Sequence, residues 1–121
     1  MARFPWPVAL LADAVLVVAF AAIGMLQHHD GFDSGRLPAV AGPFLLALAV
    51  GWVVTLAWRA PTRPVRTGLP VWAVTVAGGM ILRALTGGGT APAFIIVAAV
   101  TLLAFLVGWR LVAALVTRRP A

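Results

Sequence analysis

The sequence has no cysteine and few charged side chains, which make up only 10% of its 121 residues. The absence of cysteine excludes disulfides, thiolate chemistry and metal sites with cysteine ligands. A soluble domain has about 25% charged and roughly 45–50% apolar residues, whereas this chain is 63% hydrophobic. These departures exclude an ordinary water-soluble fold, a disordered tail and a coiled coil.

Negative charge is scarcer still: the sequence has three acidic residues and nine arginines, so its net charge is +6. Such a balance is compatible with nucleic-acid binding, but in so apolar a chain a membrane explains it better. We therefore expect the lipid bilayer as a partner and no nucleic acid. A bundle this small would need a homo-oligomer or a larger membrane complex to enclose a wide pathway.

Long uncharged runs divide the chain into membrane spans. The 22 residues after Arg36 and the 26 residues after Arg83 carry no charge, so either run can cross a hydrocarbon core about 30 Å thick. Two further apolar segments are long enough as well, although Asp13 interrupts one and Arg83 the other. The sequence therefore predicts an all-α fold, an integral membrane four-helix bundle that forms one domain over residues 1–121. The expected helices lie near residues 8–26, 40–58, 70–86 and 92–115.

A short motif recurs in the two halves of the chain. Residues 47–52 and 104–109 share the pattern Ala-x-x-Val-Gly-Trp at a distance of 57 positions, and Gly24-Met25 recurs as Gly79-Met80. Either the chain consists of two tandem helical-hairpin repeats, or the recurrence is chance in a sequence rich in Ala, Val and Gly. In both cases, small residues four positions apart, as in this motif, let helix backbones approach closely.

The arginines are distributed unevenly between the two sides of the membrane. Basic residues concentrate in cytoplasmic loops, and most of them lie before the first helix, after the second and after the fourth. We therefore expect a multi-pass protein of the cell (inner) membrane with both termini in the cytoplasm. The residues that decide this orientation are Arg3, Arg59, Arg63, Arg66, Arg118 and Arg119.

Asp13 and Arg110 are charged residues within the expected helices. A charge at the bilayer centre costs about 2.5–3.5 kcal/mol on insertion scales, so such residues usually pair. Each lies about five residues, or ~7–8 Å, from the cytoplasmic end of its helix, so two opposite charges share one layer. We expect an intramembrane ion pair, which either closes the bundle or forms a proton or substrate site.

Arg83 lies near the outer end of the third expected helix, on a helical stripe that also includes Thr75 and Gly79. Packed against the first helix, this stripe would gather polar groups at the outer mouth, where a helix N-terminus adds backbone N–H groups. The alternative is an arginine that extends to lipid phosphates beside a tight glycine turn. The candidate ligand or anion site comprises Arg83, Thr86, Gly88, Thr90, His28 and Gln27.

His28, His29 and Asp30 raise a metal or general-base interpretation. Adjacent histidines point about 100° apart on a helix, and no second ligand cluster exists in the sequence. Ser34 is the only serine, and no nucleophile constellation accompanies it. We expect no catalytic residue, no metal and no cofactor, and a loop of solvated polar residues at this position.

Motifs in both halves of the chain occur in the same order as in a known family. They are Asp13, residues 20–24 (Phe-Ala-Ala-Ile-Gly), His28, Pro43-Phe44, Gly51-Trp52, Trp72, Gly79-Met80, Arg83, Phe94 and residues 108–110 (Gly-Trp-Arg). Through them, nearly the whole chain resembles a family of small four-span prokaryotic membrane proteins, catalogued as domain of unknown function three thousand and fifty-four. The resemblance implies a four-helix integral membrane protein and no established activity.

The leading interpretation is a multi-pass membrane protein, not an enzyme, that binds or passes a small anionic or lipid-like solute. The alternative is a non-catalytic structural or accessory membrane subunit, in which the buried charges serve assembly alone. A membrane enzyme that uses His28, His29 and Asp30 is the third interpretation, and the incomplete constellation of side chains disfavours it.

Overall fold

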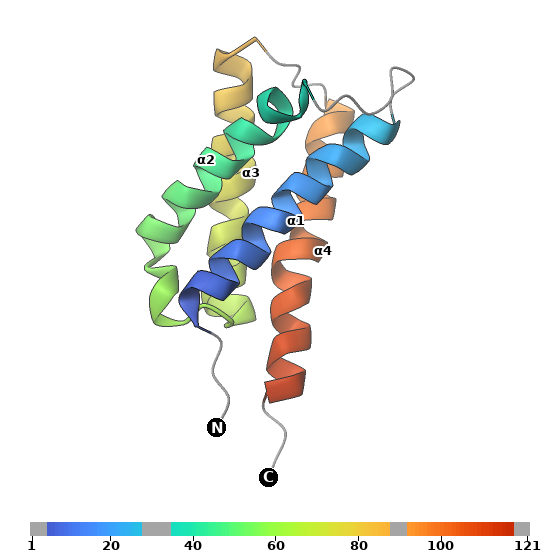
Figure 1. Cartoon of the computed structure of the whole chain (residues 1–121). Coiled ribbons are helices and arrows are strands. Elements are labelled where there is room, and N and C mark those ends of the chain that lie inside the picture. Colours follow the sequence, from blue (N-terminus) through green and yellow to red (C-terminus); the bar gives the residue numbers. More distant parts are fainter. Residues whose placement is uncertain (1–4, 28–34, 88–91, 118–121) are drawn as a thin grey trace.

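The computed structural model describes residues 5–27, 35–87 and 92–117, which form four helices that run up and down beside one another (Figure 1). A 3₁₀ turn, η1 (Ala57–Arg59), and a π-helical turn, η2 (Pro64–Gly68), connect the second helix to the third. The described residues contain no strand. The helices are α1 (Trp6–Gln27), α2 (Leu37–Thr55), α3 (Leu69–Leu85) and α4 (Pro92–Thr117).

The two ends of the bundle differ in what they hold. α1 begins and α4 ends at one end, which we call the terminal end (Figure 1). α1 ends and α2 begins at the opposite end, which we call the loop end. The turns η1 and η2 lie at the terminal end, because they join the end of α2 to the start of α3.

All four helices are long and apolar enough to cross a membrane. Apolar stretches of 19 to 25 residues coincide with them, and η2 lengthens the α3 stretch to 22 residues. Leu11, Val54 and Ile96 are each more than 60% exposed on the outside of the bundle, where lipid suits them. The all-α four-helix architecture expected from the sequence is confirmed, and its helices have the length and composition of membrane spans.

α2 spans residues 37–55 rather than the expected 40–58. It begins earlier because Pro38 fits its first turn, where the missing N–H group leaves no hydrogen bond unmade. It ends earlier because Leu56 adopts the left-handed conformation, with a φ of 53°, and donates its N–H group to the carbonyl of Val53. The other three helices agree with their expected bounds to within two residues.

Helices that follow one another in sequence also pack together in space. α1 packs against α2 and α4, and α3 also packs against α2 and α4, so α1 and α3 lie diagonally opposite each other. The expectation that the polar stripes of the first and third helices pack directly together is therefore wrong. The reason is that short connections make consecutive helices antiparallel neighbours, which leaves α1 and α3 on either side of the interior.

Small residues bring α2 and α3 close together. A Cβ atom added at Gly78 would lie 3.0 Å from the Cβ of Ala47, and one added at Gly79 would overlap the ring of Phe44. Gly51 is also buried on the α2 side of this interface. The contact is the close backbone approach that small residues at four-residue spacing permit, and van der Waals packing of this kind holds membrane helices together.

Apolar side chains fill the interior of the bundle. Aliphatic residues from α2 and α4, such as Leu48 and Leu102, are at most 1% exposed. Nearer the loop end, Phe20, Phe44 and Phe94 form a cluster with ring centroids 5.4 to 6.3 Å apart. Aromatic pairs prefer such separations. The cluster supports the wall of a cavity near the loop end.

Candidate functional site

Asp13 on α1 and Arg110 on α4 form an ion pair nearer the terminal end of the bundle. Both side chains are 0% exposed. Nη2 of Arg110 lies 2.6 Å from Oδ2 of Asp13, and Nη1 lies 2.9 Å from Oδ1, so the guanidinium binds both carboxylate oxygens. This bidentate geometry is among the strongest arginine–carboxylate contacts. The first and last helices are thereby joined by the two opposite charges that the sequence places in one layer.

Two tryptophans complete the surroundings of the Asp13 carboxylate. The indole Nε1 of Trp52 on α2 donates to Oδ2 at 2.8 Å, and that of Trp109 on α4 donates to Oδ1 at 2.7 Å. With the two bonds from Arg110, the carboxylate accepts four hydrogen bonds, which is about its full capacity. Trp52 and Trp109 are the last residues of the two copies of the recurring motif, so both copies supply an equivalent donor to one acceptor.

Arg110 also fixes the connection between α2 and α3. Its Nε donates to the carbonyl of Pro61 at 2.8 Å, and its Nη1 donates to the carbonyl of Leu106 at the same distance. The aliphatic part of its side chain passes Gly68, where an added Cβ would lie 3.2 Å from Cδ of Arg110. We call Asp13, Trp52, Trp109 and Arg110 the Asp13 cluster. It joins α1, α2 and α4 to the connection between α2 and α3, so its contacts hold the bundle closed.

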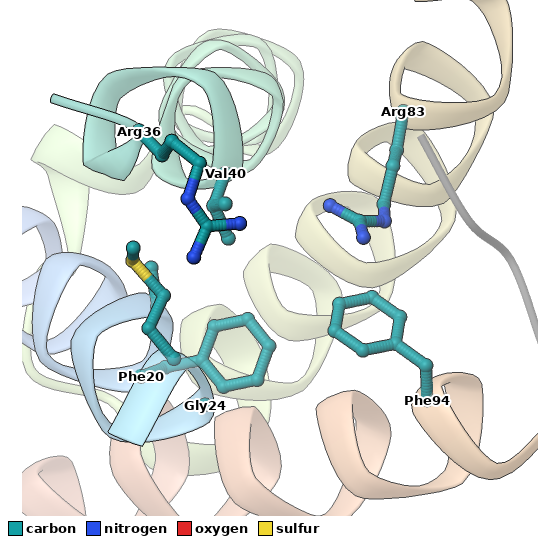
Figure 2. Close-up of a pocket in the computed structure, with 8 residues that line it drawn as sticks. Phe20, Gly24, Arg36, Val40, Arg83 and Phe94 are labelled. Carbon is teal, nitrogen blue, oxygen red and sulfur yellow. The ribbon is translucent and has the colours of Figure 1, made fainter. Parts of the chain in front are cut away.

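A second group of charged side chains surrounds a cavity of about 170 Å³ near the loop end. All four helices contribute to its lining, and Figure 2 shows the guanidinium groups of Arg36, at the start of α2, and Arg83, on α3, turned toward this space. The Arg83 guanidinium carbon lies 4.5 Å from the centroid of the Phe94 ring, a distance at which a cation and an aromatic face attract each other. The labelled lining residues are Phe20, Gly24, Arg36, Val40, Arg83 and Phe94.

A wider cavity of about 410 Å³ adjoins the first one. Arg36, Val40 and Arg83 line both cavities, so the two arginines stand between them. Pro43 and Thr86 contribute to the wider cavity alone. We call the two spaces the inner cavity and the outer cavity. Together they form a compartment that is apolar on the inner side and bordered by two basic groups on the outer side.

Between the two sites, a buried side-chain oxygen has no partner among the described residues. Thr75 on α3 is 0% exposed, and its hydroxyl makes no hydrogen bond to any described residue. Trp72, one turn earlier, donates its indole N–H group to the carbonyl of Ala99 at 2.9 Å and so links α3 to α4. A buried hydroxyl without a partner costs stability, so Thr75 is a weak point of the otherwise well-satisfied interior.

The family to which the chain belongs follows from one comparison. Residues 10–113 match the family model described as Protein of unknown function (DUF3054). The chain belongs to this family. The match includes Asp13 and Arg110 as well as Arg36 and Arg83, so both sites lie within the DUF3054 region. No curated protein and no solved structure matches the chain.

In this DUF3054 protein, only part of the candidate anion site falls on described residues. Arg83 lines both cavities and Thr86 lines the outer one, where its hydroxyl donates to the carbonyl of Leu82 at 2.9 Å. For Gln27, the structure describes the helical backbone of α1 alone. The residues of the candidate anion and metal sites that lie outside the described part of the chain are His28, His29, Asp30, Gly88 and Thr90.

Arg36 is the cavity residue that the sequence interpretation missed. In the sequence it marks only the start of an uncharged run, whereas the structure places it directly before α2, whose N-cap it forms. Two signals could have indicated its position. Pro38 is typical of a helix start, and a helix that starts there has its first residues at the same end of the bundle as Arg83.

The described residues hold no metal site of their own. Within residues 5–27, 35–87 and 92–117, no three His, Cys, Asp or Glu side chains lie close enough together to hold a metal ion. Asp13 is the acidic residue of this part of the chain, and its carboxylate is engaged by Trp52, Trp109 and Arg110.

Proposed function

We propose that this DUF3054 protein is a non-enzymatic, multi-pass protein of the cell inner membrane that binds a small anionic solute beside Arg36 and Arg83. The observation that carries the proposal is the convergence of two guanidinium groups, from different helices, on cavities whose remaining lining is largely apolar. Guanidinium groups bind carboxylates and phosphates through N–H groups along their edge. The ring of Phe94 covers one face of the Arg83 guanidinium and does not block the N–H groups along its edge.

Electrostatics near a membrane favour an anion at this position. Two guanidinium groups that border one cavity can both attract the same anion, which gains a favourable interaction with each of them. The surrounding apolar side chains lower the local dielectric constant, which strengthens each attraction relative to water. The alternative, in which Arg83 extends to lipid phosphates, explains one arginine at the membrane surface. It does not explain why Arg36 lines the same cavity.

The packed interior supports binding rather than passage of the solute. Toward the terminal end, the described core contains Phe44, Leu48, Leu102 and Leu106, each at most 1% exposed. Beyond them lies the Asp13 cluster, whose polar groups bind one another. A solute that crossed the bundle would have to displace both layers, so transport through one copy would need a large rearrangement.

The arginine distribution supports an orientation with the terminal end in the cytoplasm. Arg59, Arg63 and Arg66 are exposed and belong to the connection at the terminal end, where cytoplasmic loops carry an excess of basic residues. Under this orientation, the two cavities open on the opposite side of the membrane. A reporter fused after Ala121 should then be active only in the cytoplasm, and activity only outside the cell would reverse the assignment.

Anion binding can be tested on protein purified in an uncharged detergent. Acetate and inorganic phosphate are titrated at constant ionic strength, and thermal unfolding is followed by tryptophan fluorescence. An anion at ten times its Kd should stabilise the folded protein by about 1.4 kcal/mol. Arg36→Gln and Arg83→Gln should each abolish this stabilisation, whereas Arg59→Gln, which removes an exposed arginine at the other end, should keep it. An equal response in all three variants would show that the anions act elsewhere.

The Asp13 cluster favours a second candidate, a structural or accessory membrane subunit. Its four hydrogen bonds to one carboxylate explain the buried charges through assembly alone. The two functions differ in what Arg83 does in the cell. If Arg83→Ala changes a cellular phenotype only in proportion to the protein level, the accessory role is supported and solute binding loses its physiological basis.

A further inference from the structure

We infer that the bound solute carries a single short apolar group, an aromatic ring or a short hydrocarbon chain, attached to its anionic head. The inference rests on the proposed function and specifies the class of solute. Its basis is the division of the site into two parts, because the arginines stand between an apolar inner cavity and a wider outer cavity. A bare anion would use the arginines and leave the inner cavity empty.

The size of the inner cavity sets the size of the apolar group. Its volume is about 170 Å³. An apolar protein cavity of about 150 Å³ holds a benzene molecule, so the inner cavity has room for one ring or a chain of comparable bulk. Two acyl chains of a membrane lipid would not fit. The apolar group of the solute should therefore be small, regardless of the size of the part of the solute that lies in the outer cavity.

The walls of the inner cavity are suited to an aromatic or aliphatic group. Phe20 and Phe94 line it, with ring centroids 6.2 Å apart, and both also pack against Phe44, which holds them in place. Met25 adds a flexible side chain that adapts to different shapes. An inserted group gains dispersion contacts with walls that otherwise lack partner atoms on one side.

The arginines fix the direction in which the solute enters. Arg83 is held over the Phe94 ring, and Phe94 belongs to the inner cavity, so the charge and the apolar wall are adjacent. An anionic head at Arg36 and Arg83 therefore points its attached group toward Phe20 and Phe94 (Figure 2). The outer cavity, which Arg36 and Arg83 share, provides the space from which the head arrives.

The experiment compares acetate, hexanoate and phenylacetate with the neutral 2-phenylethanol, on the full-length protein in uncharged detergent. Each buried methylene should raise the affinity about fourfold. Phenylacetate and hexanoate should therefore bind at least about tenfold more tightly than acetate. The neutral 2-phenylethanol should bind more weakly than phenylacetate, because it lacks the head that the arginines attract.

Gly24 offers a variant that fills the inner cavity. Gly24 lines the inner cavity, and a Cβ atom added there meets no atom within 4 Å, so Gly24→Leu has room to enter the cavity. It should reduce the ratio of phenylacetate to acetate affinity to near one. Gly108→Leu is the matched control, because a Cβ added at this α4 position also meets no atom within 4 Å, and it should keep the wild-type ratio. Gly24→Ala, a smaller insertion, should lower the ratio partly.

The outcomes separate this inference from the proposed function. If no anion binds, or if binding ignores Arg83→Gln, both fall together. If acetate and phenylacetate bind equally and both depend on Arg83, anion binding stands and the apolar group is refuted. If phenylacetate keeps its advantage in Gly24→Leu and Gly24→Ala, its ring lies outside the inner cavity, and the inference is overturned.

Discussion

Asp13→Ala and Arg110→Ala should each destabilise the bundle strongly, and the double substitution should cost much less than the sum of the two. Either single substitution leaves a fully buried charge without its partner, which costs about 3–5 kcal/mol. Asp13→Ala also removes the acceptor of two indole N–H groups, and an interhelical hydrogen bond in a membrane averages about 0.6 kcal/mol. We therefore expect a loss of about 4–6 kcal/mol for Asp13→Ala and about 3–5 kcal/mol for Arg110→Ala.

The coupling between the two substitutions isolates the ion pair from the other contacts. Both variants lose the same pair, so the double variant should recover about 2–3 kcal/mol relative to additivity. Unfolding in mixed micelles of a neutral detergent and dodecyl sulfate, followed by the fluorescence of the five tryptophans, measures all four free energies. If the costs add to within about 0.5 kcal/mol, Asp13 and Arg110 stabilise the bundle independently, and the reasoning is refuted.

A charge reversal is a poorer test than this cycle. In Asp13→Arg combined with Arg110→Asp, position 13 would carry a donor, although Trp52 and Trp109 both need an acceptor there. The reversed pair would restore opposite charges and still leave two indole N–H groups unsatisfied. Failure to rescue would therefore say nothing about whether the native residues are paired.

Three further predictions use the same unfolding assay. Gly79→Ala should cost about 1–3 kcal/mol, because the added methyl overlaps the buried Phe44 ring. Gly24→Ala, where an added methyl meets no atom, should be neutral or should stabilise the protein by up to about 1 kcal/mol. Equal effects of the two substitutions would contradict the packing described for α2 and α3. Thr75→Val should stabilise by up to about 1 kcal/mol, because it removes a buried hydroxyl without a partner, and a clear loss would reveal a hydrogen bond to that hydroxyl. Trp52→Phe should cost at least about 0.5–1.5 kcal/mol, because it loses the bond to Asp13 and also reduces the volume of a core side chain, and no cost would mean that its indole does not contribute.

The helices and the Asp13–Arg110 contact could be read from the sequence for the same physical reason. In a chain that is 63% hydrophobic, a charged residue is costly wherever lipid surrounds it. The positions of the charges therefore mark the spans, and opposite charges at equal depth have few partners other than each other. Both inferences depend on depth along a helix, which counting residues provides.

Other features depend on information that residue counting does not provide. The indole donors of Trp52 and Trp109 depend on how each helix is rotated about its axis. The placement of α1 and α3 on opposite sides of the interior depends on which helices are neighbours, and depth along a helix does not indicate this. α2 ends at Leu56, which adopts the left-handed backbone conformation that glycine usually adopts at such a position, so the sequence does not indicate this helix end. The role of Arg36 depends on two helix ends meeting at one cavity, which only the assembled bundle shows.

The recurring motif gains a physical meaning that the spacing alone did not have. Its two copies end in Trp52 and Trp109, which donate from different helices to the two oxygens of one carboxylate. The acceptor itself belongs to the first half of the chain alone, because position 70, 57 residues after Asp13, is a proline. The duplication stays a prediction.

The contact between the first and last helices also has a consequence for how the protein is made. Arg110 follows Asp13 by 97 residues, which ribosomes need roughly 5–20 s to synthesise. During that interval α1 carries an acid whose arginine does not yet exist, at a cost of up to about 2.5–3.5 kcal/mol if lipid surrounds it. A chain truncated before Arg110 keeps this uncompensated acid permanently. One buried carboxylate therefore distinguishes an unfinished copy from a complete one.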